Sequence, residues 1–334
     1  MKGLTLQAIG QDLIWQEIPD PVPGDYDAIV DIKAAALNRR DFWISQGMYP
    51  GIRLPVVLGS DGVGRVTQIG EGVEIPNHPV LINPGLHWGF NQHAQAAEFE
   101  ILGMPTNGTL AQRVCVPFHC LHPVPGHLTL EQAAGLPLAG VTAYRGLFTR
   151  GQLQSSDRVL VTGIGGGVAT LAVQFAVASG ATVAVTSSSA EKIDRAKRLG
   201  AVAGFNYQDP DWHRQVLSSV GEIDLIFDGA GGAGYSQFLE LAAPAARIVN
   251  YGSTAGLPAK LDLFKVFWKQ LNLLGTTMGS EADFAAMLQF VEQHQIVPVI
   301  DSVMPMEMGQ QALQRMADKQ QFGKIVLVPP EATP

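Results

Sequence analysis

The chain has 334 residues, enough for about two domains of ordinary size. Apolar residues make up 46% and charged residues 16%, which excludes a disordered chain and allows a large core. The formal net charge of −8 argues against a nucleic-acid-binding protein, which needs a basic surface. Only two cysteines occur, Cys115 and Cys120, so a disulfide scaffold is excluded and a reducing compartment fits.

The N-terminal residues MKGLTLQAIGQDLIW lack a basic start followed by an apolar core. We therefore expect no secretory signal and a cytoplasmic protein. The longest apolar stretch, 168–185, is interrupted by Gln174, Ser179 and Gly180. A transmembrane helix needs about 20 nearly unbroken apolar residues, so we expect none here.

Residues 1–125 have the pattern of short strands separated by turns. Strands are expected over 27–37 and 109–117, and bent strands around the glycines of 55–70. Residues 77–108 form an irregular insert rich in His, Trp, Asn and Gly. This part of the chain predicts a β-rich, barrel-like domain.

The central region has a different pattern. A helix is expected over 129–150, broken at Pro137, and strands and helices then alternate. This alternation predicts a parallel sheet covered by helices on both faces. The expected strands are 158–163, 182–188, 202–207, 223–230, 246–253 and 271–277, and the first two helices between them are 168–179 and 190–200.

The last residues leave this repeat. Helices are expected over 281–294 and 307–318, and strands over 299–303 and 324–329. We found no internal repeat and no low-complexity tract.

A glycine-rich turn, TGIGGGV, carries the clearest chemical signal. Gly163, Gly165, Gly166 and Gly167 stand between an expected strand and a helix that begins near Val168. The free N–H groups at the start of such a helix can hold a pyrophosphate, and side chains larger than glycine would block its approach. A structural turn without a ligand is the alternative.

The end of the second strand bears on the choice of cofactor. A site for NAD usually has an acidic residue there for the ribose 2′-hydroxyl. This chain has Ser187, Ser188 and Ser189, followed by Lys192. Small hydroxyls and a lysine leave room for a 2′-phosphate and balance its charge, so NADP(H) is favoured. An exposed helix lysine is the alternative for Lys192.

Several segments, in order, resemble one family. They are QDLIWQEIPDPVPGDYDAIVDIKAAALNRRDFWISQGMYP, GSDGVGRVTQIG, AAGLPLAGVTAYRGLF, GIGGGVATLAVQFAVASGA and FGKIVLVP. The chain resembles medium-chain dehydrogenase/reductases of the zinc-free, quinone-oxidoreductase-like branch over essentially its whole length. The resemblance implies an α/β protein with two domains. Residues 1–125 and 278–334 would form a discontinuous GroES-like catalytic domain, and residues 126–277 a doubly wound Rossmann domain that binds NADP(H).

The resemblance also bears on zinc. The positions of the three catalytic zinc ligands in the zinc-dependent branch hold Asn38, Ser60 and Leu138 here, with Asp61 after Ser60. None of the three can bind zinc as in that branch, and the hydroxyl of its proton relay falls on Arg40. We therefore expect no metal.

Cysteines and histidines offer one other metal hypothesis. The family's structural-zinc lobe needs four cysteines, and the insert has none. Cys115, His119, Cys120 and His122 lie close in sequence, but they follow the end of a strand, where neighbouring side chains alternate between faces. Packing cysteines and surface histidines are the favoured interpretation.

The resemblance implies catalytic roles for Asn38 and Tyr49 and departs from the family pattern at Trp43, where the pattern has a tyrosine. Asn38 would donate a hydrogen bond to the acceptor carbonyl, and Tyr49 or water would supply a proton. A turn residue and a pocket wall are the respective alternatives. The implied cofactor-binding residues are Thr142, Gly165, Gly166, Gly167, Val168, Ser187, Ser188, Lys192, Tyr207, Tyr251, Gly252, Ser253 and Lys324.

The function predicted from this set is zinc-independent transfer of hydride from NADPH to a quinone or an α,β-unsaturated carbonyl compound. Two alternatives remain: an enoyl-thioester reductase, and a non-catalytic NADPH-binding or RNA-binding protein. We expect Asp41, Asp61 and Asp228 to be structural hydrogen-bond acceptors. We also expect a homodimer formed through 271–277 as the edge strand of the Rossmann sheet, because a bare apolar edge aggregates unless it is paired.

Overall fold

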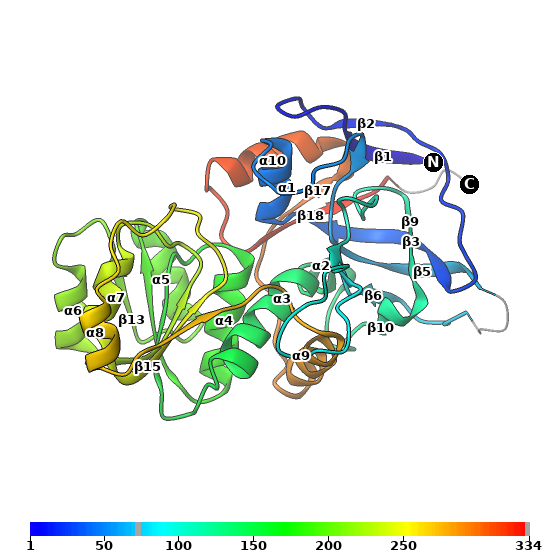
Figure 1. The fold of residues 1–334 in the computed structure, drawn as a ribbon. Coiled ribbons are helices and arrows are strands. Elements are labelled where there is room, and N and C mark those ends of the chain that lie inside the picture. Colours follow the sequence, from blue (N-terminus) through cyan, green and yellow to red (C-terminus); the bar gives the residue numbers. More distant parts are fainter. Residues whose placement is uncertain (71–74, 331–334) are drawn as a thin grey trace. The chain divides into compact units, whose positions relative to one another are not determined.

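The computed structural model describes residues 1–70 and 75–330 (Figure 1). Contacts within the chain divide it into two compact units. The first unit contains Met1–Ala139 and Gly279–Pro334, so both chain ends contribute to it. The second unit, Gly140–Met278, is continuous.

The main sheet of the first unit is built around one long strand, β3 (Asp27–Ala36). β3 pairs antiparallel with β5 (Asp61–Ile69) and β9 (Arg113–Pro117), and near its end with β18 (Lys324–Val328). The pairing with β18 brings distant parts of the chain into one sheet. The sheet order is β10-β6-β5-β3-β18-β17, with β9 also on β3. The remaining strands are β6 (Val80–Ile82), β10 (Leu121–Pro123) and β17 (Ile300–Pro305).

Two smaller sheets and several helices complete the first unit, which encloses its own apolar core. The strand order of one sheet is β2-β1-β4, and β7 pairs with β8 in the other. The strands are β1 (Lys2–Leu6), β2 (Ile14–Glu17), β4 (Val56–Val57), β7 (Gly85–Leu86) and β8 (Glu100–Ile101). The α-helices are α1 (Arg39–Ser45), α2 (Leu130–Ala134), α9 (Glu281–Gln293) and α10 (Gly309–Ala317), and the 3₁₀ turns are Phe118–Cys120 and Met306–Met308.

The helix expected over 129–150 is interrupted at Pro137, as predicted. α3 (Pro137–Tyr144) begins at the proline, because a residue without an N–H fits the first position of a helix. A π-helical segment, Arg145–Arg150, follows it. Segment 126–139, which we assigned to the nucleotide-binding domain, belongs to the first unit.

The second unit has a six-stranded sheet in which every pair of neighbouring strands is parallel. The order β13-β12-β11-β14-β15-β16 reverses direction beside β11, as in a doubly wound Rossmann sheet. The predicted fold class, a GroES-like β-rich domain plus a Rossmann domain, is confirmed. The strands are β11 (Arg158–Val161), β12 (Thr182–Ser187), β13 (Ala203–Asn206), β14 (Ile223–Asp228), β15 (Ala242–Asn250) and β16 (Asn272–Gly275).

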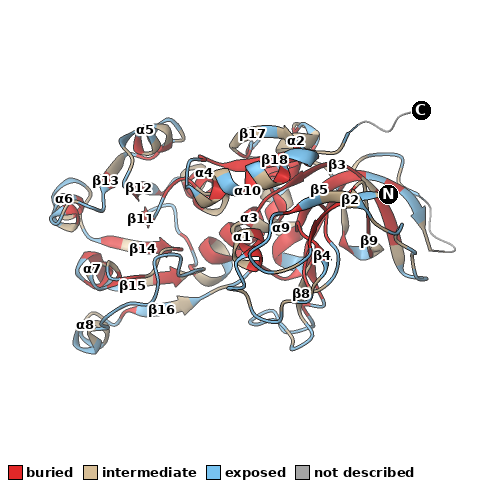
Figure 2. Ribbon diagram, turned by 90° about the horizontal axis from the view of Figure 1, so that it is seen from above, coloured by how far each residue is buried: buried red, intermediate tan, exposed pale blue. Residues whose placement is uncertain are grey.

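Helices lie along this sheet with exposed residues on their outer sides (Figure 2). The apolar stretch 168–185 is divided between α4 and β12, because Gly180 ends the helical run. No helix in the described ranges is long and apolar enough to cross a membrane. The helices are α4 (Gly167–Ala178), α5 (Ala190–Arg198), α6 (Trp212–Ser219), α7 (Tyr235–Leu241) and α8 (Leu263–Trp268).

Candidate active site

The glycine-rich turn joins β11 to α4 in the second unit. Gly163 has a φ of +62° and Gly165 a φ of +145°, a region of backbone conformation that favours glycine. A Cβ placed on Gly163 or Gly166 would meet no atom within 4 Å. Gly166 caps α4, which begins at Gly167 and continues through Val168. The turn therefore presents open space in front of a helix N-terminus, the arrangement that a pyrophosphate needs.

The next strand of the second unit, β12, brings further predicted residues to this turn. β12 ends at Ser187, whose hydroxyl accepts a hydrogen bond from the backbone of Ser189 at 3.1 Å. Ser189 in turn caps α5, accepting from the backbone N–H of Lys192 at 3.3 Å. The Lys192 Nζ lies 3.2 Å from the position that a Cβ on Gly165 would occupy. The lysine predicted from the serine-rich strand end thus lies at the glycine turn.

Two other predicted residues flank the end of this strand. Ser188 is exposed, and Tyr207, which follows β13, is 47% exposed. The backbone N–H of Tyr207 donates to the carbonyl of Ser187 at 3.3 Å. Ser187, Ser188 and Tyr207 therefore lie together at the carboxyl ends of neighbouring strands, which is where a nucleotide binds in open parallel sheets.

A third group of predicted residues follows β15. The ring of Tyr251 stacks on Phe227 with 4.6 Å between centroids. Burial, and secondarily the charge of Asp228, raise the pKa of the Tyr251 phenol, so its hydroxyl stays protonated at neutral pH. Gly252 and Ser253 are exposed on the loop that follows.

Asp228 organises the carboxyl end of the same sheet and was not among the predicted site residues. The hydroxyl of Thr162 donates to its Oδ1 at 2.5 Å, and Asn250 Nδ2 donates to its Oδ2 at 2.9 Å. The backbone N–H groups of Ala230 and Gly231 also donate to it. Asp228 is fully buried and accepts these hydrogen bonds, as we expected of a structural carboxylate.

Thr142, the remaining predicted cofactor-binding residue of the second unit, lies on α3 and is buried.

The first unit contains a second polar cluster, formed by Asn38, Asp61 and Lys324. Lys324 Nζ donates to Asn38 Oδ1 at 2.6 Å and to Asp61 Oδ2 at 2.7 Å. Asn38 Nδ2 donates to the same Asp61 oxygen at 2.9 Å. The three side chains form a closed ring of hydrogen bonds, and their exposed fractions are 6%, 0% and 4%. The structure thus brings together a predicted catalytic residue and Lys324, which we had predicted to bind the cofactor.

Backbone contacts fix this cluster further. The backbone N–H of Leu138 donates to Asp61 Oδ1 at 2.8 Å. The backbone N–H of Asn38 donates to Asp41 Oδ2 at 2.7 Å, and that of Gly59 donates to Asp41 Oδ1 at 3.2 Å. Asp41 and Asp61 are therefore structural acceptors, as expected, and both carboxylate oxygens of each are in use.

These contacts test whether the cluster fits zinc. Asn38, Ser60 and Leu138 offer no thiolate or imidazole, and both oxygens of Asp61 accept hydrogen bonds within the unit. The ammonium of Lys324 already lies against the carboxylate. The donor set therefore does not fit the catalytic zinc site of the zinc-dependent branch.

Arg40 and Ser60 form a neighbouring buried pair. Arg40 Nη1 donates to the Ser60 hydroxyl at 2.8 Å and to the Leu102 carbonyl at 2.9 Å. Its guanidinium carbon lies 5.1 Å from the ring centroid of Tyr49, a cation–π contact that holds this predicted catalytic ring against α1. Arg40 is thus a structural arginine. It occupies the position that holds the proton-relay hydroxyl in the zinc-dependent branch, but it has no hydroxyl.

The cysteine and histidine cluster has no metal-binding geometry. Both thiols are partly or fully buried, and burial raises the pKa of Cys120 to about 12 and that of Cys115 to about 11. No group of three or more His, Cys, Asp or Glu side chains within residues 1–70 and 75–330 is placed to hold a metal ion.

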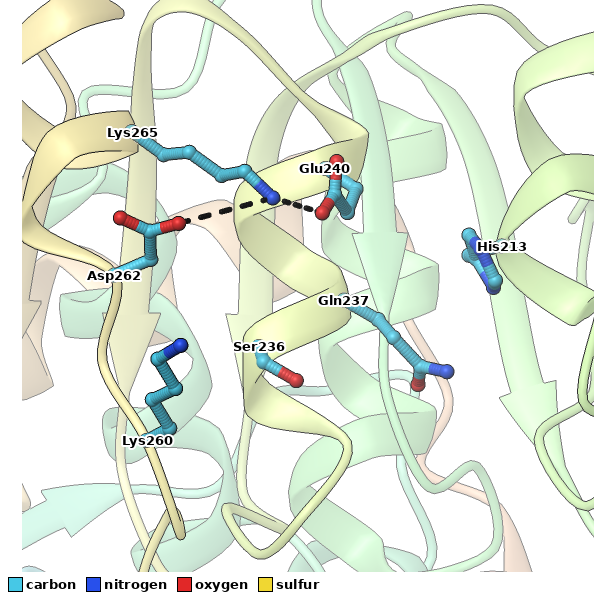
Figure 3. Close-up of a pocket in the computed structure, with 7 residues that line it drawn as sticks. All are labelled: His213, Ser236, Gln237, Glu240, Lys260, Asp262 and Lys265. Atoms are coloured by element: carbon cyan, nitrogen blue, oxygen red, sulfur yellow. Dashed lines mark hydrogen bonds and ion pairs between the residues drawn. The ribbon is translucent and has the colours of Figure 1, made fainter.

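A cavity of about 220 Å³ lies elsewhere in the second unit (Figure 3). Its lining is polar, and Lys265 pairs there with Glu240 and Asp262. None of the predicted site residues lines it. The lining residues are His213, Ser236, Gln237, Glu240, Lys260, Asp262 and Lys265.

Comparison with known proteins identifies the family. A model described as alcohol dehydrogenase GroES-like domain matches residues 24–126, and one described as zinc-binding dehydrogenase matches residues 167–293. The chain is 32% identical over 332 residues to the zinc-type alcohol dehydrogenase-like protein YogA of Leptosphaeria maculans, covering 93% of this chain and 92% of that protein. The chain belongs to the medium-chain dehydrogenase/reductase superfamily. This medium-chain dehydrogenase/reductase is therefore an oxidoreductase of a family that binds a nicotinamide cofactor.

Other relatives of this medium-chain dehydrogenase/reductase carry different names. An acryloyl-coenzyme A reductase of Sulfurisphaera tokodaii is 28% identical, covering 98% of this chain and all of that protein. The crystal structure of an NAD-dependent alcohol dehydrogenase matches with a TM-score of 0.93 at 35% identity, covering 98% of this chain and 99% of that chain. The 2-octenoyl-CoA carboxylase reductase CinF, in complex with NADP and 2-octenoyl-CoA, matches with a TM-score of 0.88 at 25% identity, covering 99% of this chain and 88% of that chain.

Proposed function

We propose that this protein is a zinc-independent, NADPH-dependent reductase of the quinone-oxidoreductase-like branch that transfers hydride to a quinone or an α,β-unsaturated carbonyl compound. The proposal rests on the hydrogen-bond donors of the Asn38 side chain. An asparagine amide nitrogen has two hydrogens to donate, and only one has a partner in the described part of the chain, the carboxylate of Asp61. The second remains to bond an acceptor oxygen.

This free donor suits a reaction in which negative charge develops on oxygen. The bound nicotinamide cofactor supplies the hydride. Asn38 donates a hydrogen bond to the carbonyl oxygen of the acceptor as its charge grows. The Tyr49 hydroxyl, for which no hydrogen bond within the described residues is found, supplies the proton or orients a water that does so.

The acceptor follows from the chemistry of the cluster. Oxidation of a simple alcohol relies on a Lewis acid in zinc enzymes, and the donor set around Asp61 does not fit zinc. A quinone or a conjugated carbonyl is already electrophilic and needs only a hydrogen-bond donor. Among conjugated carbonyls, enoyl thioesters are the second candidate, because similar proteins are named acryloyl-coenzyme A reductase and 2-octenoyl-CoA carboxylase reductase.

For the cofactor, we propose NADP(H) on the position of Lys192 over Gly165 and on the serines at the end of β12. Related proteins named NAD-dependent make the comparison of the two cofactors necessary. A non-catalytic protein that binds NADPH or RNA remains the alternative class.

One panel of assays tests these proposals. A quinone, a simple enone and crotonyl-CoA are each reduced with NADPH and with NADH, and ethanol oxidation with NADP⁺ serves as the control. We expect turnover of at least one acceptor with NADPH, little with NADH, and no effect of a chelator. Chelator-sensitive ethanol oxidation would contradict the zinc-independent mechanism, and tight NADPH binding without turnover would favour the non-catalytic alternative.

We also propose a cytoplasmic homodimer. β16 lies at the edge of the Rossmann sheet, and the short helix α8 just before it has no buried residue. Unpaired strand edges and apolar patches of this kind mark association sites. Pairing of β16 with its two-fold copy would continue the sheet and cover the patch. The exposed apolar side chains of α8 are Leu263 (65%), Phe264 (60%), Phe267 (62%) and Trp268 (72%).

The dimer has a direct test. Sedimentation at micromolar concentration should give twice the mass of one chain, and Phe267→Ser with Trp268→Ser should shift the protein to monomers without unfolding it. Tyr26→Ser, at an equally exposed aromatic residue of the first unit, is the control and should leave the dimer intact. A monomeric unmodified protein would refute the proposal.

A further inference from the structure

Lys324 and Asp61 hold Asn38 in a way that the sequence did not indicate. We infer that both are positioning residues, which fix the Asn38 carboxamide so that its remaining N–H points outward as a hydrogen-bond donor. The kinetic part of this inference rests on the proposed function, whereas the geometric part does not. In this inference Lys324 positions Asn38, and it does not contact the cofactor as we expected from the sequence.

The argument begins with donors and acceptors. The oxygen and nitrogen ends of a carboxamide have nearly the same shape, so packing alone does not choose between the two orientations. An ammonium has only hydrogens to donate, and an ionised carboxylate only accepts. Lys324 at 2.6 Å therefore requires the oxygen of Asn38 on its side, and Asp61 at 2.9 Å requires the nitrogen. Only one orientation satisfies both.

Burial makes this choice strict. Asp61 is fully buried and Lys324 is 4% exposed, so little water is available to replace either partner. A reversed carboxamide would place its oxygen against the carboxylate and its N–H₂ against the ammonium. Unsatisfied or repelling polar groups cost far more inside a protein than in water. The reversed orientation is therefore excluded while both charges are present.

The backbone makes the cluster rigid. β5 and β18, which carry Asp61 and Lys324, both pair with β3, which ends just before Asn38. The backbone N–H of Leu37 donates to the carbonyl of Ile325 at 3.0 Å, beside the side-chain contact. All three side chains thus extend from neighbouring strands or their ends, where their separations are fixed by the sheet.

The charge of Lys324 also strengthens Asn38 as a hydrogen-bond donor. A cation bonded to the oxygen of an amide draws electron density from its nitrogen, so hydrogen bonds in such a chain strengthen one another. Asp61 balances the charge of Lys324, so the cluster adds no net charge to the site. The expected result is a donor that is fixed before the substrate binds, which is the condition for efficient stabilisation of a developing oxyanion.

The first experiment is a double-mutant cycle on kcat with an enone and NADPH, using Asn38→Ala, Lys324→Met and the two together. We expect Lys324→Met to lower kcat about 10-fold to 100-fold, as for a misplaced catalytic group, and to leave the dissociation constant of NADPH unchanged. In the Asn38→Ala background the same change should have roughly no further effect, because Lys324 acts through Asn38. Additive effects, or a loss of NADPH affinity, would overturn the inference.

Two further variants distinguish a loss of positioning from a loss of stability. Lys324→Met leaves the Asp61 carboxylate buried without its cation, so Lys324→Met with Asp61→Asn removes both charges. Leu327→Ala is the matched control, since its side chain packs in the apolar core from the same strand and has no hydrogen-bonding group. We expect the control to lower the melting temperature and to leave kcat nearly unchanged. A similar fall of kcat in Leu327→Ala would show that Lys324 acts through stability alone.

A measurement without turnover separates this inference from the proposed function. In protein labelled with ¹⁵N-asparagine, the side-chain amide signals of Asn38 are assigned by their loss in Asn38→Ala. We expect one slowly exchanging hydrogen, bonded to Asp61, and loss of its protection in Lys324→Met. Unchanged protection would overturn the inference whatever the activity. Protection lost in the variant, in a protein that reduces no enone or quinone, would support the positioning and refute the proposed function.

Discussion

The two polar regions of the molecule are organised in opposite ways. In the first unit, Asn38, Asp61 and Lys324 satisfy one another with side-chain hydrogen bonds, and burial removes nearly all water. In the second unit, the turn around Gly166 is made of backbone, and the space in front of it is open. The side chains of the first region hold one another in place. The second region has room for a ligand because its glycines carry no side chains.

This difference determines what a substitution costs. A change in the buried cluster leaves a charge without a partner, so it reduces stability as well as activity. A change at Gly166 in the glycine turn disturbs no existing contact, so we expect it to reduce cofactor affinity alone. The following substitutions separate these effects, from the largest expected effect to the smallest.

Asp61→Leu should have the largest effect. It leaves the ammonium of Lys324 buried without a carboxylate, and breaking a buried ion pair from one side costs about 3 to 5 kcal/mol of unfolding free energy. Urea denaturation measures the shift of the midpoint. Asp20→Asn, at an exposed ion pair, is the control and should change the midpoint little. If both variants shift it equally, the cluster is not the stabilising element that its contacts indicate.

Asn38→Ala tests the catalytic part of the same cluster. One lost oxyanion donor typically lowers kcat about 10²-fold to 10³-fold, so we expect that fall for an enone. NADPH affinity should stay intact, and a quinone should suffer less because its ring accepts hydride more readily. Tyr49→Phe should have a smaller effect, because water can replace its proton. Unchanged kcat with an enone would remove Asn38 from the mechanism.

Gly166→Ala tests the open turn. Gly166 has a φ of −87°, which alanine adopts, and its added methyl would meet no atom of the protein. We expect an unchanged melting temperature and an NADPH dissociation constant at least about tenfold higher, roughly 1.4 kcal/mol. Gly275→Ala is the control, since its methyl also meets nothing and the position ends a different strand, β16. Equal affinity in both variants would place the pyrophosphate elsewhere.

Lys192→Ala should have the smallest effect. Loss of its ammonium should raise the KM for NADPH about tenfold, within the range for a hydrogen bond to a charged group, and leave that for NADH nearly unchanged. Lys197→Ala, an exposed lysine on the same helix, should change neither. An unmodified enzyme that prefers NADH would refute the assignment of the 2′-phosphate to this position.

Much of the fold was accessible from the sequence because its signals are local. The alternation of apolar strands and helices predicted the parallel sheet, and the glycines of the turn predicted where α4 begins. The break at Pro137 was also correct, since proline acts on its own neighbourhood. The boundary between the units was displaced to Ala139 and Gly140, because the contacts that assign 126–139 to a unit lie far away in sequence.

The contacts of the site were less accessible. Asn38 was chosen from a motif, but its partner Lys324 lies 286 positions away, and no local pattern joins them. One signal was available: Lys324 begins an otherwise apolar buried strand, and a buried lysine needs an acceptor. The exposed aromatic residues of α8 were also missed, because a six-residue helix shows too little periodicity to separate an inner from an outer face.

The separation between Asn38 and Lys324 has a consequence for protein synthesis. At about 5 to 20 residues per second, a ribosome needs about 15 to 60 s to add the 286 positions between them. The second unit lies wholly within that interval, so it can fold while β3 still lacks β18 and Asp61 still lacks its cation. During this period the nascent first unit has an open strand edge and an unbalanced carboxylate. The second unit can therefore form before the first is complete, and β18, which emerges late, then pairs with β3 and brings the cation of Lys324 to Asp61.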